Sequence, residues 1–430
     1  MSFRKTLFWV HLVAGVVAGG VIGIMSFTGA VLAFETEIVA WAERDARRVA
    51  PPAIDAPRLA LDELLQRVRA HDPEARPTGI TVSADRRDAV MFAVGRDIAY
   101  YVNPYTGEVR QPASTAVHDF MRTMVEWHRW LAMSGDHRAT GKAITGACNT
   151  AFLILGLTGL YLWWPRNRSW RALKPSVWFL RDARGKARDW NWHNVIGFWS
   201  LPVLIVLTAS GMVISYRWAG NLVYRAAGEQ PPAQPGPGGL GGAAVDVPRP
   251  DAGARRLGYE ALLVAAQQDS PGWATIALRL GNPRAAGARP RAASNVPATQ
   301  PDTSAGPERR VNSGSGERRG PQAVTVVIRE GDRWPRTAST TLTLNPFTGD
   351  VLRREAFSDL STGRQARLWL RFLHTGQALG WAGQLVAGLA CVGGGVLVWT
   401  GFALAWRRFF GRRPKAAAAA EPAVVLSKAQ

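Results

Sequence analysis

Four long apolar runs alternate with polar segments along the chain, at 8–34, 142–164, 193–216 and 378–406. Each run reaches or exceeds the roughly 20 residues that a helix needs to cross a bilayer core. The interruptions are mostly Gly, Ser and Thr, which membrane helices tolerate. Helices of soluble domains are usually shorter, so the pattern predicts four membrane-spanning helices. The first run exceeds the apolar region of a signal peptide and lacks a clear A-x-A site, which favours an uncleaved helix.

The polar segments between the runs differ strongly in charge. The short segment 165–192 carries eight Lys or Arg against two Asp, and further basic residues precede the first run and fill the tail 407–430. Because Lys and Arg are enriched in the cytoplasmic loops of membrane proteins, we expect both termini to be cytoplasmic in a bacterial inner membrane. The two long segments, 35–141 and 217–377, are then periplasmic.

The two long segments repeat one pattern. Asn-Pro-x-Thr-Gly stands at 103–107 and at 345–349, each time between two short alternating stretches. Pro sets one backbone dihedral and Gly accepts positive φ, so each motif predicts a tight turn between strands. A helical pattern and another strand precede each hairpin, which predicts two small α+β domains. In the second, a stretch at about 282–322, rich in Pro, Gly, Ser and Arg, is typical of disorder.

The apolar runs repeat as well. His11 is followed by Gly15 and Gly29, at spacings of 4 and 18, and the same spacings relate the third run's His193, Gly197 and Gly211. Runs two and four share the glycine pairs Gly141/Gly159 and Gly383/Gly401. Eighteen residues are about five helical turns, so such positions share one face. The chain therefore reads as an internal duplication of a unit made of span, outer domain and span.

Composition excludes several classes of protein. The net charge of +20 suggests a nucleic-acid binder at first. The basic residues are concentrated in the cytoplasmic segments and the 282–322 stretch, so the charge is mainly a topology signal and we expect no nucleic-acid partner. Two Cys exclude a disulfide scaffold and a Cys-rich zinc or iron–sulfur site.

Four of the seven histidines occupy repeat-matched positions. The repeat pairs His11 with His193 at the cytoplasmic ends of the spans, and His128 with His374 at the periplasmic ends. A single interfacial His is commonly just hydrogen-bonded, but ionisable groups at membrane depth are often functional. Two His facing inward at each end of a four-helix bundle favour two bis-imidazole haems. The glycines Gly15, Gly29, Gly197 and Gly211 would make room for the macrocycles.

Other metals fit less well. Zinc sites usually have more than two protein ligands, and no Cys or carboxylate set accompanies either His pair. Copper would favour more Met than the seven present. His118 and His137 have no repeat partner, and either one could replace His128 as the outer ligand.

The chain resembles the PepSY-associated transmembrane proteins, iron-regulated inner-membrane proteins that include ferric-siderophore reductases. The resemblance implies a membrane α-helical four-helix bundle with two small α+β PepSY-like periplasmic domains. It also implies two b-type haems and outward electron transfer to a ferric siderophore or other ferric chelate. The first half departs from the second by four extra residues before Gly141. The resemblance rests on these motifs: His11-x3-Gly15 with Phe27-Thr-Gly29, Trp127-His-Arg-Trp-Leu131, Leu157-Thr-Gly-Leu-Tyr-Leu-Trp-Trp-Pro165, Trp192-His-Asn-Val-Ile-Gly197, Leu373-His-Thr-Gly-Gln377 and both Asn-Pro-x-Thr-Gly turns.

The electron donor has no binding motif in the chain. There is neither a G-x-G-x-x-G after a strand nor a P-loop, so we expect quinol or a separate cytoplasmic flavoprotein to supply electrons, and membrane lipid to be the other partner. Three alternatives remain open. The first is a non-enzymatic PepSY-type sensor or peptidase-regulating protein, which predicts no haem. The second is a signalling partner in iron uptake, which would not reduce a ferric chelate, and the third is a transporter. Four spans without inverted repeats argue against the transporter.

Overall fold

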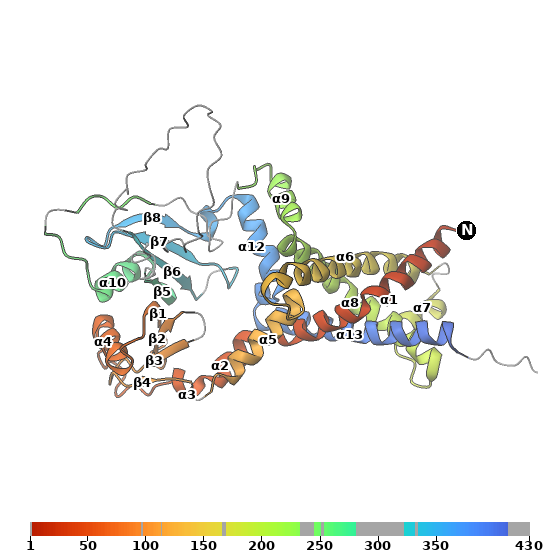
Figure 1. Cartoon of the computed structure of the whole chain (residues 1–430), viewed down its shortest axis with the longest axis horizontal. Helices are drawn as coiled ribbons and strands as arrows, with labels where there is room; N and C mark the ends of the chain where they lie inside the picture. The colour runs from red at the N-terminus through yellow and green to blue at the C-terminus, as the bar shows by residue number, and fades with distance from the viewer. Residues whose placement is uncertain are drawn as a thin grey trace, which may run out of the picture. The chain divides into compact units, whose positions relative to one another are not determined.

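The computed structural model describes residues 2–95, 98–112, 114–165, 169–232, 245–250, 253–280, 322–331 and 334–411. Within them the chain forms two compact units (Figure 1). The helical unit comprises residues 1–30, 127–209 and 387–430, and the sheet unit comprises 31–126 and 210–386. Most of the 282–322 stretch expected to be disordered, and most of the tail 407–430, lie outside the described residues.

Four helices in the described residues are long and apolar enough to cross a membrane, which confirms the four predicted spans. The first three are longer than their apolar runs, because a helix continues into water wherever the flanking residues favour it. The fourth is as long as its run and lies three residues further along the chain. At about 1.5 Å per residue, 30 residues extend well beyond a hydrocarbon core of about 30 Å. The four are α1 (Phe3–Leu32), α6 (Arg138–Trp163), α8 (Gly185–Ser215) and α13 (Trp381–Phe409), with the short 3₁₀ segment η1 (Gly135–His137) directly before α6.

Small residues let the spanning helices approach closely in the helical unit. A Cβ atom added to Gly394 of α13 would lie 2.8 Å from the Ser26 hydroxyl of α1 and 3.4 Å from the Phe152 ring of α6. Lipid tails are as apolar as the side chains, so close packing and interhelical hydrogen bonds hold such bundles together. One such bond runs from the Asn149 side-chain nitrogen to the Thr208 carbonyl oxygen, at 2.9 Å.

The sheet unit contains one sheet of eight antiparallel strands, in the order β4-β3-β2-β1-β5-β6-β7-β8. The strands are β1 (Pro77–Ser83), β2 (Val90–Val94), β3 (Ile98–Val102), β4 (Val109–Arg110), β5 (Trp273–Arg279), β6 (Val324–Glu330), β7 (Thr340–Leu344) and β8 (Val351–Glu355). Its helices are α2 (Glu35–Ala42), α3 (Arg44–Arg47), α4 (Leu61–His71), α5 (Ala116–Trp130), α9 (Arg217–Ala226), α10 (Tyr259–Asp269) and α12 (Thr362–His374), with 3₁₀ segments η2 (Phe357–Asp359) and η3 (Gln377–Leu379).

The core of this unit lies between the sheet and helices α4 and α10. The buried residues of α4 recur at helical spacing, as in Leu61, Leu64 and Val68. The central strands pair so that Ile80 of β1 faces Leu278 of β5, and both side chains are fully buried. The sequence patterns anticipated β2, β3, β6 and β7 but missed β1 and β5, the two strands that join the halves into one sheet.

The two halves of the sheet unit share contacts at the starts of their helices and in their turns. At the start of α10, the Asp62 carboxylate accepts a hydrogen bond from the backbone N–H of Tyr259 at 2.9 Å. At the start of α4, the Glu260 carboxylate accepts one from the backbone N–H of Leu61 at 2.8 Å. Each helix thus supplies the acid that satisfies the free N–H groups at the start of the other. Both Asn-Pro-x-Thr-Gly motifs form turns, with φ of 74° at Gly107 and 80° at Gly349.

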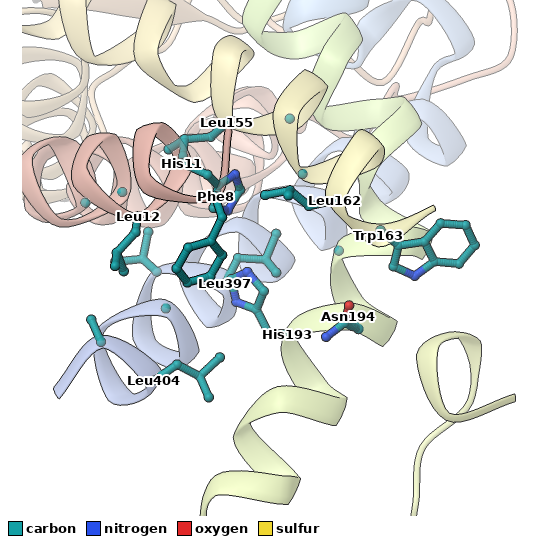
Figure 2. Close-up of a pocket in the computed structure, with 18 of the residues that line it drawn as sticks. Phe8, His11, Leu12, Leu155, Leu162, Trp163, His193, Asn194, Leu397 and Leu404 are labelled. Carbon is teal, nitrogen blue, oxygen red and sulfur yellow. The ribbon is translucent and has the colours of Figure 1, made fainter. Parts of the chain in front are cut away.

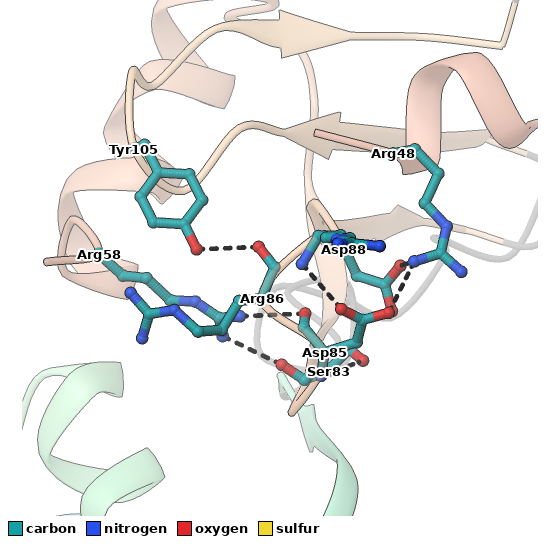
Figure 3. A network of polar contacts seen from close by, with 8 residues as sticks. Arg48, Arg58, Ser83, Asp85, Arg86, Asp88 and Tyr105 are labelled. Atoms are coloured by element: carbon teal, nitrogen blue, oxygen red, sulfur yellow. Dashed lines mark hydrogen bonds and ion pairs between the residues drawn. The ribbon is translucent and has the colours of Figure 1, made fainter. Parts of the chain in front are cut away.

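Ion pairs and backbone contacts order the connection after β1 (Figure 3). The Arg58 guanidinium donates to the Ser83 carbonyl oxygen at 3.0 Å, while that of Arg48 lies 2.7 Å from an Asp85 oxygen and 3.1 Å from an Asp88 oxygen. Backbone donation from Arg87, followed by the Arg48 contact, lowers the pKa of Asp85. These groups are largely exposed, so they fix loop geometry more than they add stability.

Candidate cofactor site

His11 of α1 and His193 of α8 face one cavity of about 750 Å³ in the helical unit (Figure 2). Their ring centres are 6.4 Å apart and their planes are inclined at 84°. The volume falls within the roughly 300–1,000 Å³ of typical small-molecule and cofactor sites. The structure therefore brings together the first of the two histidine pairs expected from the repeat.

The separation of the rings fits two ligands of one metal ion. Imidazole nitrogens lie about 2 Å from a bound metal, so two imidazoles on opposite sides of one ion have ring centres about 6 Å apart. Opposed ligation does not require parallel rings, since each imidazole can rotate about its metal–nitrogen bond. His11 and His193 are thus spaced so that both could hold one metal ion between them.

Hydroxyl groups fix the orientation of both rings. The Nδ1 atom of His11 lies 3.0 Å from the Thr158 Oγ1 atom, and that of His193 lies 2.9 Å from the Thr400 Oγ1 atom. Thr158 donates its proton to the Ile154 carbonyl oxygen at 2.7 Å, as helical Thr residues commonly do. Its oxygen must then accept from the histidine, so Nδ1 of the neutral ring carries the proton and Nε2 keeps its lone pair. Thr400 makes the equivalent bond to Val396 at 2.8 Å.

The second pair of histidines has the same type of partner. In the helical unit, the Nδ1 atom of His128 lies 3.0 Å from Thr28 Oγ1 and 3.1 Å from the Met25 carbonyl oxygen. A carbonyl only accepts, so Nδ1 is again the protonated nitrogen. In the sheet unit, the Nδ1 atom of His374 lies 3.2 Å from Ser210 Oγ. The pairing of His128 with His374 remains a prediction, because each belongs to a different unit.

Three of the repeat-matched glycines lie directly beneath histidine rings. An added Cβ would stand 3.2 Å from His11 Cε1 at Gly159, 3.3 Å from His128 Cε1 at Gly29, and 3.7 Å from His193 Cε1 at Gly401. At Gly29 the sequence suggested space for a macrocycle, whereas the structure places the His128 ring there. Gly15 and Gly197 do line the cavity, and Gly211 is buried.

Basic side chains line the cavity together with its apolar walls. Leu12, Leu155 and Leu397 are among the wall residues, and the basic ones are Arg4, Lys5, Lys186 and Arg408. Arg4 donates to the Leu162 carbonyl oxygen, and the Arg408 guanidinium lies over the Phe8 ring. The ammonium groups of Lys5 and Lys186 make no hydrogen bond or ion pair with another described residue. The lining thus matches a large apolar ligand that carries acidic substituents.

The other candidate ligands have different surroundings. His118 places Nε2 2.7 Å from a carboxylate oxygen of Glu43, in the sheet unit, so the ring nitrogen that stays free at His11 and His193 has a partner here. His137 lies exposed in η1. Among the described residues, no group of three or more His, Cys, Asp or Glu side chains is placed to hold a metal ion.

The four extra residues in the first half leave the local packing unchanged. A Cβ at Gly141 would collide with the carbonyl oxygen of Trp130, two residues after His128, and a Cβ at Gly383 would collide with that of Gly376, two residues after His374. Both halves have a 3₁₀ segment in this interval, η1 and η3, and the first half adds two residues with positive φ angles, 131 and 132, before η1. Both histidines therefore precede a turn that packs on an equivalent glycine.

The hydroxyl partners of the histidines were not anticipated from the sequence. A signal was present, because Thr28, Thr158, Ser210 and Thr400 each stand directly before one of the repeat-matched glycines. The same dipeptide thus supplies a hydroxyl for the ring nitrogen and, at three of the four sites, an open surface against the ring.

The bundle and its histidines define an integral membrane protein with four spanning helices and an amphiphilic cavity between them. The chain belongs to the PepSY-associated TM region family, whose model matches residues 8–408, nearly the whole chain. A search of curated proteins finds no match.

Proposed function

We propose that this protein is a di-haem electron-transfer protein of the bacterial inner membrane, which reduces a ferric siderophore or another ferric chelate on the periplasmic side. One observation carries the proposal. The ring centres of His11 and His193 lie 6.4 Å apart at one cavity, and both Nδ1 atoms are hydrogen-bonded to hydroxyls. A metal-ligating histidine almost always donates the N–H of its second ring nitrogen to an oxygen acceptor, and the threonine hydroxyl oxygens are such acceptors here.

The residues fit a b-type haem. When bound, such a haem supplies a one-electron iron couple whose potential depends on axial ligands and burial. Thr158 and Thr400 hold the two imidazoles with Nε2 available, and the leucines give the cavity apolar walls. Lys5 and Lys186 are suited to the acidic substituents, since charge-assisted hydrogen bonds to carboxylates are strong.

A second b-type haem is proposed for His128 and His374. Both have a hydroxyl 3.0 to 3.2 Å from Nδ1, the arrangement found at the first pair. The internal duplication that we infer for the chain relates the two pairs, and it is supported by the reciprocal helix caps and matched turns of the sheet unit. We infer that this unit consists of two PepSY-like domains facing the periplasm, with both termini cytoplasmic, as the Lys and Arg distribution favours.

Reduction of the chelated iron follows from the direction of electron flow. Quinol or a separate cytoplasmic flavoprotein supplies electrons, and Fe(III) in the chelate takes up one electron to become Fe(II). Hard oxygen ligands bind Fe(II) less tightly, so reduction releases the metal. The reaction is an oxidoreduction without bond formation at carbon, so we assign no nucleophile or general base.

A reduced-minus-oxidised spectrum tests the proposal directly. We expect two haems per chain in the purified protein, about one in His11→Ala and about one in His374→Ala, and reduction of a ferric hydroxamate by the prereduced wild type. Lys142→Gln, at an exposed position outside the cavity, should keep both haems. Protein without a Soret band would exclude the proposal and favour a PepSY-type sensor or peptidase regulator.

A further inference from the structure

We infer that a second cavity, beside the His193 end of α8, binds the ring of a membrane quinol that delivers electrons to the first haem site. The inference rests on the proposed function and names its electron donor and the place where the donor binds. The cavity has a volume of about 410 Å³ and lies within the helical unit. Its lining includes Phe179, Leu180, Arg181, Trp192 and Ile196.

The cavity is built from a loop fastened to the spanning helices. The side-chain oxygen of Asn191, a fully buried residue of α8, accepts from the Leu180 backbone N–H at 3.0 Å, and its nitrogen donates to the Trp178 carbonyl oxygen at 3.0 Å. The Trp199 indole N–H donates to the Val177 carbonyl oxygen, also at 3.0 Å. A buried amide and a tryptophan thus hold the end of α7 (Trp170–Val177) and the following residues against α8.

This loop lies at the depth of the membrane surface. Val177 contacts Trp199, which is fourteen residues into the long helix α8 and 62% exposed in the isolated chain. Trp178 and Phe179 are 62% and 50% exposed. Aromatic side chains concentrate where hydrocarbon meets head groups, so these residues face lipid. A ligand dissolved in the bilayer can therefore reach the cavity without crossing water.

The lining matches the chemistry of a quinone ring. Phe179 and Trp192 meet edge to face, with ring centres 6.3 Å apart, and provide flat apolar surface for stacking. Arg181 makes no hydrogen bond or ion pair with another described residue, so its guanidinium is available to a ligand. A guanidinium N–H donates to an oxygen acceptor such as a ring carbonyl. The second guanidinium, of Arg188, is already paired with Asp189 at 2.9 Å.

The cavity adjoins the first histidine pair through two tryptophans. Trp192 precedes His193 on α8, and Trp399 precedes Thr400, the hydroxyl partner of His193, on α13. The two indoles contact each other with ring centres 6.2 Å apart. The segment 192–197 of α8 therefore lines both cavities, since Trp192 and Ile196 line the second while His193 and Gly197 line the first.

The electrons balance with two one-electron acceptors. A quinol gives up two electrons and two protons and leaves as the quinone, with the protons passing to water at the cytoplasmic surface. The two electrons reduce two ferric haem irons to the ferrous state. Each quinol thus provides for the reduction of two ferric chelates.

Binding of decylubiquinone to the purified full-length protein tests the inference, measured by isothermal titration calorimetry in neutral detergent. We expect Arg181→Gln to weaken binding about tenfold, the effect of losing one hydrogen bond to a charged group. Arg184→Gln is the matched control, because it removes the same charge three residues along the chain. Arg184 is exposed and does not line the cavity. The same ratio should hold in His11→Ala/His193→Ala protein, which lacks both ligands of the first haem site.

Stopped-flow reduction by decylubiquinol provides the second readout. We expect the initial rate of haem reduction to fall about tenfold in Arg181→Gln while reduction by dithionite is unchanged. Equal effects of Arg181→Gln and Arg184→Gln would overturn the inference. It would also be overturned if the protein bound no quinone but bound phosphatidylglycerol in an Arg181-dependent manner. Protein without haem that still binds quinone at Arg181 would overturn the proposed function alone.

Discussion

The Nδ1 atom of His193 lies 2.9 Å from the Oγ1 atom of Thr400, a residue 207 positions later in the chain. Because Thr400 donates its own proton to Val396, this contact fixes the tautomer that leaves Nε2 free. The same relationship links His11 to Thr158 and His128 to Thr28. A hydroxyl on one helix therefore orients a histidine on another at each of these three sites.

Removing the Thr400 hydroxyl should weaken the first haem site without abolishing the fold. We expect Thr400→Val, which keeps the shape, to lower haem affinity about 10- to 100-fold, the usual cost of losing an outer partner of a metal ligand. Haem transfer to excess apomyoglobin measures the change. Thr400→Ser keeps the hydroxyl and should behave like the wild type; equal loss in both variants would show that the hydroxyl has no role.

A side chain at Gly159 should displace the His11 ring. The added Cβ would already stand 3.2 Å from His11 Cε1, and Val brings two further methyl groups. We expect Gly159→Val to retain about one haem per chain instead of two, measured by the pyridine haemochrome spectrum. Gly20→Val is the control on α1, because a Cβ there meets nothing within 4 Å. Two haems in both variants would contradict the packing argument.

The lysines of the first cavity should hold the acidic edge of the haem. We expect Lys5→Gln and Lys186→Gln each to speed haem loss a few-fold, since ion pairs near a surface contribute up to about 1 kcal/mol. In the double variant, haem and its dimethyl ester should be lost at the same rate. If both variants still discriminate between the two forms as the wild type does, the acidic groups lie elsewhere.

The buried Glu43 carboxylate, which contacts Arg47, Tyr101 and His118, should make the sheet unit sensitive to acid. Burial alone raises the pKa of Glu43, but hydrogen bonds from His118, Tyr101 and Arg47 outweigh burial and lower the pKa below its usual value. A lowered folded-state pKa stabilises the protein at pH values above the unfolded-state pKa of a glutamate, about 4.3. This stabilisation is lost as the pH falls through the folded-state pKa. At pH values below about 4, the midpoint temperature of unfolding should therefore fall, and it should fall less in Glu43→Gln.

Truncating the same residue should be costly at neutral pH. Glu43→Ala leaves Arg47, His118 and the Tyr101 hydroxyl without the carboxylate that joins them, and removing one partner of a buried ion pair costs roughly 3–5 kcal/mol. Arg47 and His118 are each 38% exposed, so we expect the lower end of that range. Differential scanning calorimetry of the full-length protein checks it. Glu63→Ala, in an exposed pair with Arg67, should change little.

The sequence by itself determined the spans and the turns, and it predicts the repeat. Long apolar runs, Asn-Pro-x-Thr-Gly and the spacings of 4 and 18 are local patterns, and local patterns report periodicity and backbone preference. They therefore located the helices that carry His11 and His193 and predicted that the two would meet. They also gave the family, which the match over residues 8–408 confirms.

Only the tertiary structure decided which residues meet across long separations. The pairing of β1 with β5 joins strands nearly two hundred residues apart, and each strand taken alone is a short stretch with no distinctive pattern. The Thr158 and Thr400 hydroxyls read as ordinary helix residues until another helix places a histidine against them. Hydrophobic periodicity specifies which face of an element is buried, whereas the partner on that face depends on packing between helices, and packing decided what the histidines contact.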